Sequence, residues 1–140
     1  MKTDFKSTYR TSINAPIETV WQALVNPELV KKYFFGTVLE TTWKIGSEIF
    51  WTGEYEGNIY KERGIVLEYL PHEKITYSYF SSWSGLEDKP ENHLWICYEL
   101  NKVKNETELV ITQSNYDQEK ANHSSANWEK VIDGLKKIVE

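Results

Sequence analysis

The residues that could carry out metal or acid–base chemistry in this sequence are few and widely spaced. The three histidines, His72, His93 and His123, share no spacing typical of a metal site, and no carboxylate stands at a matching interval. We interpret all three as surface residues of chance origin, although His93 and His123 could both lie near the mouth of a cavity. The pattern predicts no metal site.

The other reactive side chains do not form a catalytic pattern either. By strand alternation Glu48, Glu54 and Glu68 fall on or near a solvent face, where charge protects strand edges. Cys97 alternates with inward-facing neighbours and no basic residue adjoins it, which favours an inert thiol over a nucleophile. The sequence also lacks a glycine-rich phosphate loop and a nucleophile elbow. We therefore expect no catalytic residue and no cofactor.

Aromatic residues and one glutamine give a more informative pattern. Several tyrosines share one inward face, and each buried hydroxyl needs a hydrogen-bond partner, which a cavity with water or a polar ligand supplies more readily than a sealed core. Gln113 shares its face with Leu109 and Ile111, where it contacts either a ligand or a neighbouring tyrosine. Plain core and cavity lining both remain open. The candidate cavity-lining residues are Tyr33, Phe34, Trp51, Tyr77, Tyr79, Tyr98, Gln113, Trp128 and Ile132.

A long helix at the end of the chain must support these residues. From about 117 to 140, apolar residues recur at steps of three and four and leave a charged opposite face. Asn115 followed by Gln118 resembles a helix start with a side-chain cap. Gly134 interrupts this helix, either because the polar face tolerates it or because another backbone approaches closely. A helix with such a broad apolar face needs a sheet to lie on.

Most of the remaining chain has the two-residue period of strands. The alternation predicts strands over residues 5–13, 38–43, 48–55, 60–69, 75–80, 94–103 and 107–114. Two short helices, with Asn14 as a possible cap of the first and a break at Asn26-Pro27, follow the first strand. Gly57-Asn58 predicts a two-residue hairpin. The polar loop 81–92 contains Trp83 and Leu86, which could cover a pocket mouth, meet a partner, or belong to a solvated loop.

The order of these elements predicts one fold class. Successive hairpins make the sheet antiparallel, and a twisted sheet of six or seven strands curls so that one long helix fits its concave face. We expect a single α+β domain over residues 1–140, with two short helices after the first strand.

Size, charge and composition limit the classes of partner and the cellular location that we expect for this protein. The 140 residues carry a formal net charge of -5 and no basic cluster, which argues against nucleic-acid binding. The sequence has no apolar run of membrane-spanning length, no signal-peptide core and only one cysteine, so we expect a cytoplasmic protein. We expect it to be a monomer or weak homodimer.

Short motifs spread over about residues 8 to 140 resemble one known family. They are the segment INAPIETVWQAL at 13–24; Gly46 with Ile49 and Trp51; Gly64, Val66, Glu68 and Pro71; Thr107, Leu109 and Ile111; and a helix from Asn127-Trp128 to Leu135-Lys136. Together they are similar to the family of activator of 90-kDa heat shock protein ATPase homologues, in the START-like (SRPBCC) superfamily. One departure is Asn127, where the family often has glycine.

The resemblance implies a helix-grip fold with a pocket between the concave sheet and the long helix. Members use such pockets for lipids, hormones, polyketides or other apolar molecules, and some are enzymes. The co-chaperone that names the family has an N-terminal domain with no counterpart in these 140 residues, so we do not expect its role to carry over.

Three hypotheses about function follow. The preferred one is non-catalytic binding of a small, mostly apolar or lipid-like molecule, oriented by tyrosines and Gln113. The second is a small cyclase-like or hydrolase-like enzyme, which predicts a titratable group with a shifted pKa in the cavity. The third is a protein-interaction module, which predicts an exposed apolar patch and a filled core.

Overall fold

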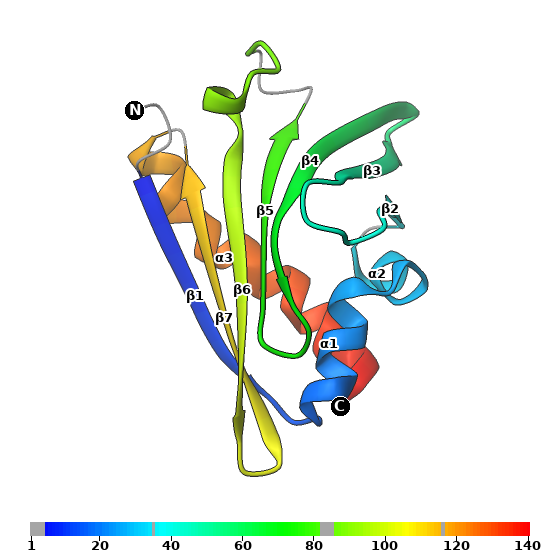
Figure 1. The fold of residues 1–140 in the computed structure, drawn as a ribbon, viewed down its shortest axis with the longest axis vertical. Coiled ribbons are helices and arrows are strands. Elements are labelled where there is room, and N and C mark those ends of the chain that lie inside the picture. Colours follow the sequence, from blue (N-terminus) through cyan, green and yellow to red (C-terminus); the bar gives the residue numbers. More distant parts are fainter. Residues whose placement is uncertain (1–4, 35, 82–85, 116) are drawn as a thin grey trace.

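A seven-stranded antiparallel sheet curls around one long helix in the structure, a computed structural model that describes residues 5–34, 36–81, 86–115 and 117–140 (Figure 1). In chain order the elements are β1 (Phe5–Ile13), α1 (Ile17–Val25), α2 (Pro27–Tyr33), β2 (Val38–Glu40), β3 (Glu48–Tyr55), β4 (Asn58–Leu70), β5 (Lys74–Ser81), the 3-10 turn η2 (Pro90–Asn92), β6 (Leu94–Val103), β7 (Glu106–Asn115) and α3 (Gln118–Val139). The predicted α+β class and the antiparallel curved sheet are confirmed.

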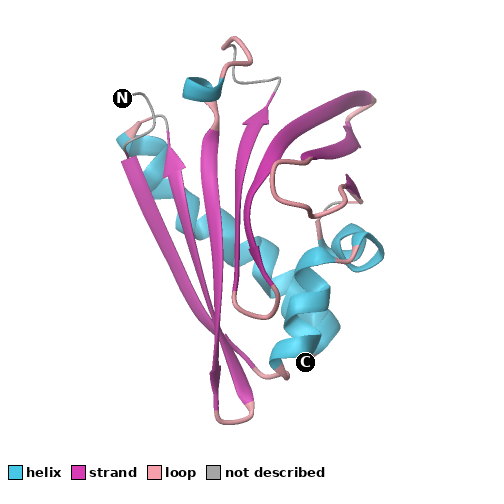
Figure 2. Ribbon diagram, viewed as in Figure 1, coloured by secondary structure: helices cyan, strands magenta, loops and turns pink. Residues whose placement is uncertain are grey.

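The sheet is a meander to which the first strand is added at the end. Its order is β1-β7-β6-β5-β4-β3-β2, so β1 pairs with the last strand and β2 forms the opposite edge. Helix α3 crosses one face of the sheet, and α1 and α2 lie at the end of the sheet where the chain also terminates (Figures 1 and 2). The helix packs on β1 and β7 and on the two short helices.

Proline and asparagine mark the start of each short helix and the break between them. Asn26 ends α1 and caps α2, because its side-chain oxygen accepts the Glu28 N–H at 3.0 Å and Pro27 fits the first helical position. The prediction that Asn14 caps α1 is wrong. Pro16 occupies the cap position without a side-chain bond, and the Asn14 backbone N–H instead donates to the Glu140 carboxylate at 2.9 Å.

The start of α3 also differs from the prediction. Asp117 is the cap, because its Oδ1 accepts the Lys120 N–H at 2.8 Å. Asn115 remains in β7, where its side-chain amide donates to the Phe5 carbonyl at 2.9 Å and ties the last strand to the first. The Asp117 carboxylate also interacts favourably with the positive, N-terminal end of the helix dipole.

The β3–β4 hairpin and the end of β2 differ from the prediction for local reasons. The hairpin loop after β3 is Glu56-Gly57, one residue earlier than predicted, because Tyr55 pairs with Asn58 and both loop residues have positive φ. Strand β2 ends at Glu40 rather than residue 43. Beyond it, Trp43 adopts a φ of 61° and its indole N–H donates to the Val25 carbonyl at 3.0 Å.

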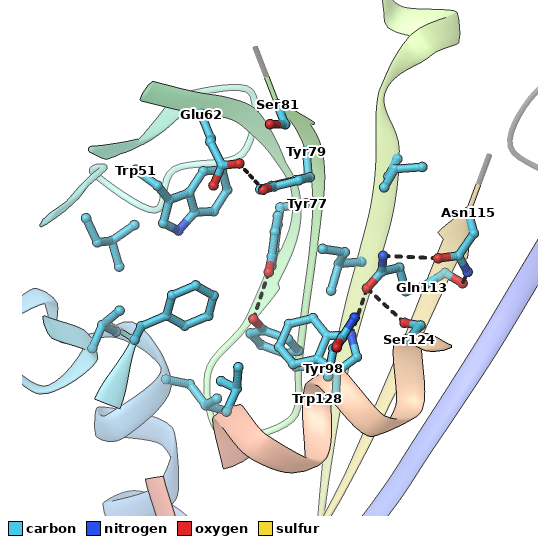
Figure 3. Close-up of a pocket in the computed structure, with 18 of the residues that line it drawn as sticks. Trp51, Glu62, Tyr77, Tyr79, Ser81, Tyr98, Gln113, Asn115, Ser124 and Trp128 are labelled. Carbon is cyan, nitrogen blue, oxygen red and sulfur yellow. Dashed lines mark hydrogen bonds between the residues drawn. The ribbon is translucent and has the colours of Figure 1, made fainter. Parts of the chain in front are cut away.

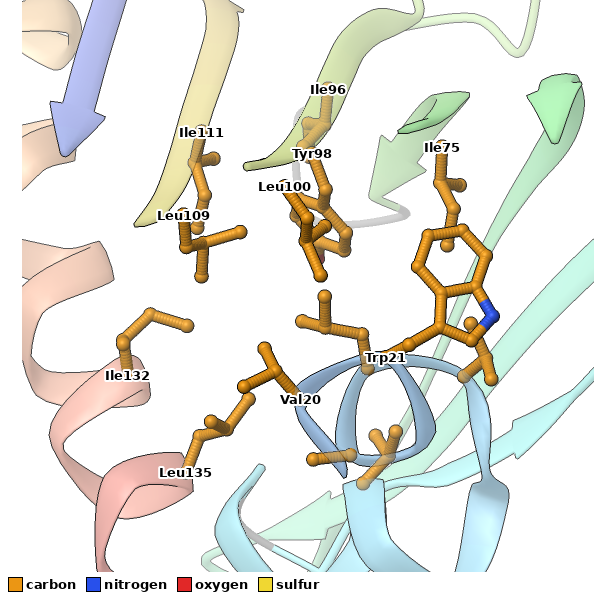
Figure 4. Close-up of a cluster of buried hydrophobic side chains, with 14 of the residues drawn as sticks. Val20, Trp21, Ile75, Ile96, Tyr98, Leu100, Leu109, Ile111, Ile132 and Leu135 are labelled. Carbon is orange, nitrogen blue, oxygen red and sulfur yellow. The ribbon is translucent and has the colours of Figure 1, made fainter. Parts of the chain in front are cut away.

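One half of the space under α3 is a filled hydrophobic core (Figure 4). Ile132 and Leu135 of α3 are 1% and 0% exposed, and they face Val20 of α1 and Leu109 of β7, which are also fully buried. Burying each such side chain contributes roughly 1.5–3 kcal/mol. This core holds the C-terminal half of the helix against the sheet.

None of the described helices has the length and apolar character needed to cross a membrane.

Candidate functional site

The other half of the space under α3 is a cavity of about 610 Å³. It lies between the N-terminal half of α3, the inward face of β3 to β7, and the short helices (Figure 3). The residues that line it are Leu24, Val30, Tyr33, Phe34, Leu39, Trp43, Trp51, Glu62, Tyr77, Tyr79, Ser81, Leu94, Ile96, Tyr98, Gln113, Asn115, Glu119, Lys120, His123, Ser124, Asn127, Trp128 and Val131.

A continuous row of aromatic rings forms one wall of the cavity. It begins at Trp128 on α3, whose ring meets that of Tyr98 at 5.8 Å between centroids. Tyr98 meets Tyr77 at 5.5 Å, and Tyr77 meets Trp51 at 5.4 Å. Trp51 also meets Tyr79 at 5.4 Å in an edge-to-face arrangement. Because these pairs are tilted or edge-to-face, as aromatic pairs prefer, the wall is rigid and presents both ring faces and edges.

The strand period explains why these residues share a wall. Residues 77 and 79 of β5 differ by two positions and Tyr98 of β6 lies across from the same strand, so all three point to the concave face. Gly64 of β4 makes room for the backbone of β5, because a Cβ at this position would lie 1.8 Å from the Ser78 carbonyl oxygen. The backbones of β4 and β5 can therefore approach closely at this point.

The hydroxyls of the four tyrosines that line the cavity all have protein partners. The hydroxyls of Tyr77 and Tyr98 share a hydrogen bond of 2.7 Å, Tyr33 donates to the Ala23 carbonyl at 2.6 Å, and Tyr79 donates to the Glu62 carboxylate. Each of these hydroxyls thus has a protein partner without a ligand, although the bond between Tyr77 and Tyr98 uses only one of the two protons of that pair. The cavity's volume, rather than the count of polar groups, is what distinguishes it from a sealed core.

Burial changes the acidity of three of these tyrosines. Loss of solvent raises the pKa of Tyr33, Tyr77 and Tyr98 above the usual value for a phenol. All three hydroxyls therefore stay protonated at neutral pH. They act there as neutral hydrogen-bonding groups rather than as bases.

Gln113 is the centre of a polar cluster on the α3 side of the cavity. Its Oε1 accepts the Trp128 indole N–H at 2.7 Å and the Ser124 hydroxyl at 3.4 Å, and its side-chain amide donates to Asn115 at 3.3 Å (Figure 3). As strand parity predicted, the Gln113 side chain points inward, but its hydrogen-bond partner is Trp128 rather than a tyrosine. This cluster fixes the Trp128 ring at the cavity wall.

Glu62 is a cavity residue that the sequence prediction missed. It lies on β4 two positions before Gly64 and four before Val66, both buried, so the two-residue period places it on the inward face. This two-residue period is the sequence signal that could have identified Glu62 as a cavity residue. Its carboxylate accepts the Tyr79 hydroxyl (Figure 3). The neighbouring Arg63 points to the opposite face, where it pairs with Asp88 at 2.7 Å.

The nine predicted lining residues separate into two groups. Tyr33, Phe34, Trp51, Tyr77, Tyr79, Tyr98, Gln113 and Trp128 lie along the cavity. Ile132 instead packs in the filled core, one helical turn beyond Trp128.

Gly134 of α3 packs closely against α2. A Cβ at this position would lie 3.2 Å from the Tyr33 Cβ. Of the two explanations for a glycine in this helix, the close approach of another segment therefore applies. The close packing of α2 against α3 also places Tyr33 at the cavity.

The expectation that all histidines lie at the surface is wrong for His93. It is 9% exposed, stacks on Phe80, and bonds Asp88 through Nε2 at 2.6 Å and Ser78 through Nδ1 at 3.2 Å. Bonds from His93 and Arg63 lower the pKa of Asp88. Although Ser78, His93 and Asp88 are linked in the order of a catalytic triad, none of them lines the cavity. These hydrogen bonds tie residues 86–93 to the sheet.

The remaining predicted features lie as follows. His72 is exposed in the β4–β5 turn beside Trp21, and His123 is exposed at the cavity mouth. Cys97 does not line the cavity, and burial raises the pKa of its thiol, consistent with an inert residue. Leu86 is 40% exposed. Trp83, predicted to cover the mouth or meet a partner, lies outside the described residues.

A curved antiparallel sheet that holds a long C-terminal helix over a ligand-sized cavity defines the helix-grip class of proteins. Within that class, the chain belongs to the family described as Activator of Hsp90 ATPase homolog 1-like protein, whose model matches residues 14–140. The resemblance noted from the sequence motifs is thus confirmed. No curated protein sequence matches the chain.

Solved structures agree with this assignment. ChR145 from Cytophaga hutchinsonii is 40% identical, with a TM-score of 0.85 over 99% of this chain and 95% of that one. CV1439 from Chromobacterium violaceum is 21% identical (TM-score 0.79, 97% of both chains). The structure described as the Aha1 dimer from Colwellia psychrerythraea is 22% identical (TM-score 0.73, 96% of both chains). The last two show likeness of fold alone.

Proposed function

We propose that the protein binds a small, mostly apolar molecule in the cavity between α3 and the sheet, without catalysis. The observation that carries this proposal is the cavity itself, about 610 Å³ and walled by a row of aromatic rings. Ligand pockets of about 300–1,000 Å³ hold drug-sized molecules and are lined mostly by apolar and aromatic side chains with a few polar groups. In this proposal the aromatic faces supply affinity, while the tyrosines and Gln113 orient the ligand.

The chemistry of the lining favours binding over catalysis. A shifted pKa in the cavity was the feature expected of an enzyme, and three tyrosines have one. The shift is upward, however, so these hydroxyls exchange protons less readily at neutral pH and serve better as fixed hydrogen-bonding groups. The filled core expected of an interaction module does not match a cavity of this size.

We further propose that the protein works in the cytoplasm as a monomer or weak homodimer. The free, buried thiol of Cys97 is compatible with a reducing compartment. The Colwellia relative described as a dimer supports a homodimer rather than a larger assembly. Light scattering across a concentration series, from micromolar to millimolar, would measure the association directly.

Native mass spectrometry of the freshly purified protein tests the main proposal. We expect either a carried molecule, lost on denaturation, or a stoichiometric 1:1 complex after addition of an apolar aromatic probe such as 2-acetylnaphthalene. The matched control is Val131→Phe, which places a larger side chain at the cavity wall. The absence of both carried and added ligand in the wild type, together with no thermal stabilisation by the probe, would contradict the proposal.

A further inference from the structure

We propose that the paired hydroxyls of Tyr77 and Tyr98 form a hydrogen-bond donor site that selects ligands with a neutral acceptor oxygen, such as a carbonyl, inside an aromatic framework. This inference rests on the proposed binding function and specifies which apolar molecules the cavity takes. It concerns one atom-sized position in the middle of the aromatic wall (Figure 3).

The two hydroxyls have more protons than their mutual bond uses. Each tyrosine hydroxyl has one proton to donate and can also accept. The 2.7 Å contact between the two oxygens uses one of the two protons, whichever residue donates. Among the described residues, neither hydroxyl makes any other hydrogen bond. One proton of the pair therefore remains available.

The location of the pair directs this proton to the cavity. Tyr77 and Tyr98 are 4% and 7% exposed, and both line the cavity. The neighbouring rings, Trp51 beside Tyr77 and Trp128 beside Tyr98, are in ring contact with the pair, and the nearby Trp128 indole N–H already donates to Gln113. An unused buried donor costs free energy. A molecule that brings an acceptor to this point is therefore favoured over a plain hydrocarbon.

The ionisation state of the pair fixes its role as a donor. Burial raises the pKa of both hydroxyls, so the proton is present at neutral pH. A neutral acceptor suits this environment better than a carboxylate, because an unpaired charge in an apolar site is costly. The donor lies between two tryptophan rings, which favours an acceptor in the middle of a flat molecule with aromatic surface on both sides.

Two isosteric probes test the inference. 2-Acetylnaphthalene carries a carbonyl where 2-isopropenylnaphthalene carries a methylene group, and both would report binding through tryptophan fluorescence. We expect the ratio of ketone affinity to hydrocarbon affinity to be about three- to tenfold higher in the wild type than in the variant that lacks both hydroxyls, the usual range for one net hydrogen bond. The preference must be compared among variants, because the ratio between proteins cancels the different water solubilities of the probes.

Substitutions at the two tyrosines should give a specific pattern. Tyr77→Phe and Tyr98→Phe each leave one hydroxyl with its proton unshared, so each single variant keeps the preference for the ketone. The double variant loses it. The matched control is Tyr69→Phe, which keeps the preference because Tyr69 packs on Trp21 and does not line the cavity.

Each outcome decides a separate point. A ketone-to-hydrocarbon affinity ratio that is the same in the wild type and in the double variant overturns the inference, while binding itself upholds the proposed function. If neither probe binds the wild type, both proposals fail. Should the double variant not fold by circular dichroism, the infrared carbonyl stretch of bound 2-acetylnaphthalene decides: a downshift in the wild type that Tyr69→Phe retains supports the donor site, and an unshifted band overturns it.

Discussion

The two halves of α3 cover the same sheet in different ways. The C-terminal half, around Ile132 and Leu135, lies on a core in which the facing side chains are fully buried. The N-terminal half, around Ser124 and Trp128, covers a cavity lined by aromatic rings and a few polar groups. One helix thus serves as a structural element at one end and as a cavity wall at the other.

The difference follows from what each half faces. The filled half faces branched aliphatic side chains, which interdigitate with few voids. The cavity half faces rigid rings that are held to one another edge to face and by hydrogen bonds between their own polar ends. Rings fixed in this way cannot collapse into the space beside them. The same sheet therefore supports both a packed core and an open volume.

The first prediction, with the largest expected effect, compares two leucine truncations. Leu135→Ala in the filled half should lower the free energy of unfolding by an amount near the upper end of about 2–5 kcal/mol, because it creates a new void. Leu94→Ala at the cavity wall should cost about half as much, because that side chain already borders open space. Urea denaturation measures both values, and equal losses would remove the distinction between the halves.

The second prediction adds volume instead of removing it. Val20→Phe in the filled half should destabilise the protein by about 1–3 kcal/mol through overpacking. Val131→Phe at the cavity wall should cost less than about 1 kcal/mol and should weaken binding of 2-acetylnaphthalene. Thermal unfolding and a fluorescence titration provide the two measurements. A destabilisation at position 131 as large as that at position 20 would show that the cavity wall cannot accept volume.

The third prediction concerns the polar cluster that fixes Trp128. Gln113→Leu removes the acceptor of the indole N–H and should cost about 1–2 kcal/mol, since the donor is then buried without a partner. The indole proton of Trp128 should move upfield in the NMR spectrum. Thr112→Val on the same strand is the control, because residue 112 does not line the cavity. An unchanged Trp128 resonance in Gln113→Leu would disprove the role of this bond.

The smallest expected effect is at the start of α3. Backbone N–H bonding from Lys120 lowers the pKa of Asp117 below its usual value. A group whose pKa is lowered by folding stabilises the protein above its unfolded pKa, and this contribution disappears as the pH falls through the folded pKa. Asp117→Ala should therefore reduce stability at neutral pH and leave it nearly unchanged in strong acid. Asp117→Asn should keep the cap without this pH dependence.

Hydrogen exchange distinguishes where the loss of the cap acts. In Asp117→Ala the first turns of α3, which border the cavity, should exchange faster, while the turn around Leu135 stays protected by the filled core. Uniform acceleration along the helix would mean that the two halves open as one unit.

Much of the fold could be predicted from the sequence because it depends on periodicity. The three- and four-residue steps of α3 and the two-residue steps of β1, β3 and β6 identify those elements, and the predicted limits of all three strands are the observed ones. The two cap predictions were wrong by two residues each, and the hairpin prediction was wrong by one. At α3, two polar residues competed for the cap. Asp117 lies next to the helix, whereas Asn115 is held by the first strand.

The candidate site was less predictable because it depends on contacts between distant segments. Strand parity places Tyr77, Tyr98 and Gln113 on one face, but parity alone does not reveal a void. The burial of His93 depends on Phe80 and Asp88, whose approach no local pattern encodes. Glu62 was not among the predicted lining residues, although its two-residue step from Gly64 gave its direction.

The measurement that tests the central claim most directly is an NMR titration of the wild type with 2-acetylnaphthalene, observed through tryptophan indole resonances. Trp51 and Trp128 line the cavity, whereas Trp21 is 2% exposed in the packed region around α1. We predict saturable shifts of the Trp51 and Trp128 indoles and of the Gln113 side-chain amide, with Trp21 unchanged. Equal shifts of all three indoles, or no saturable shift of Trp51 and Trp128, would contradict a ligand site in the cavity half.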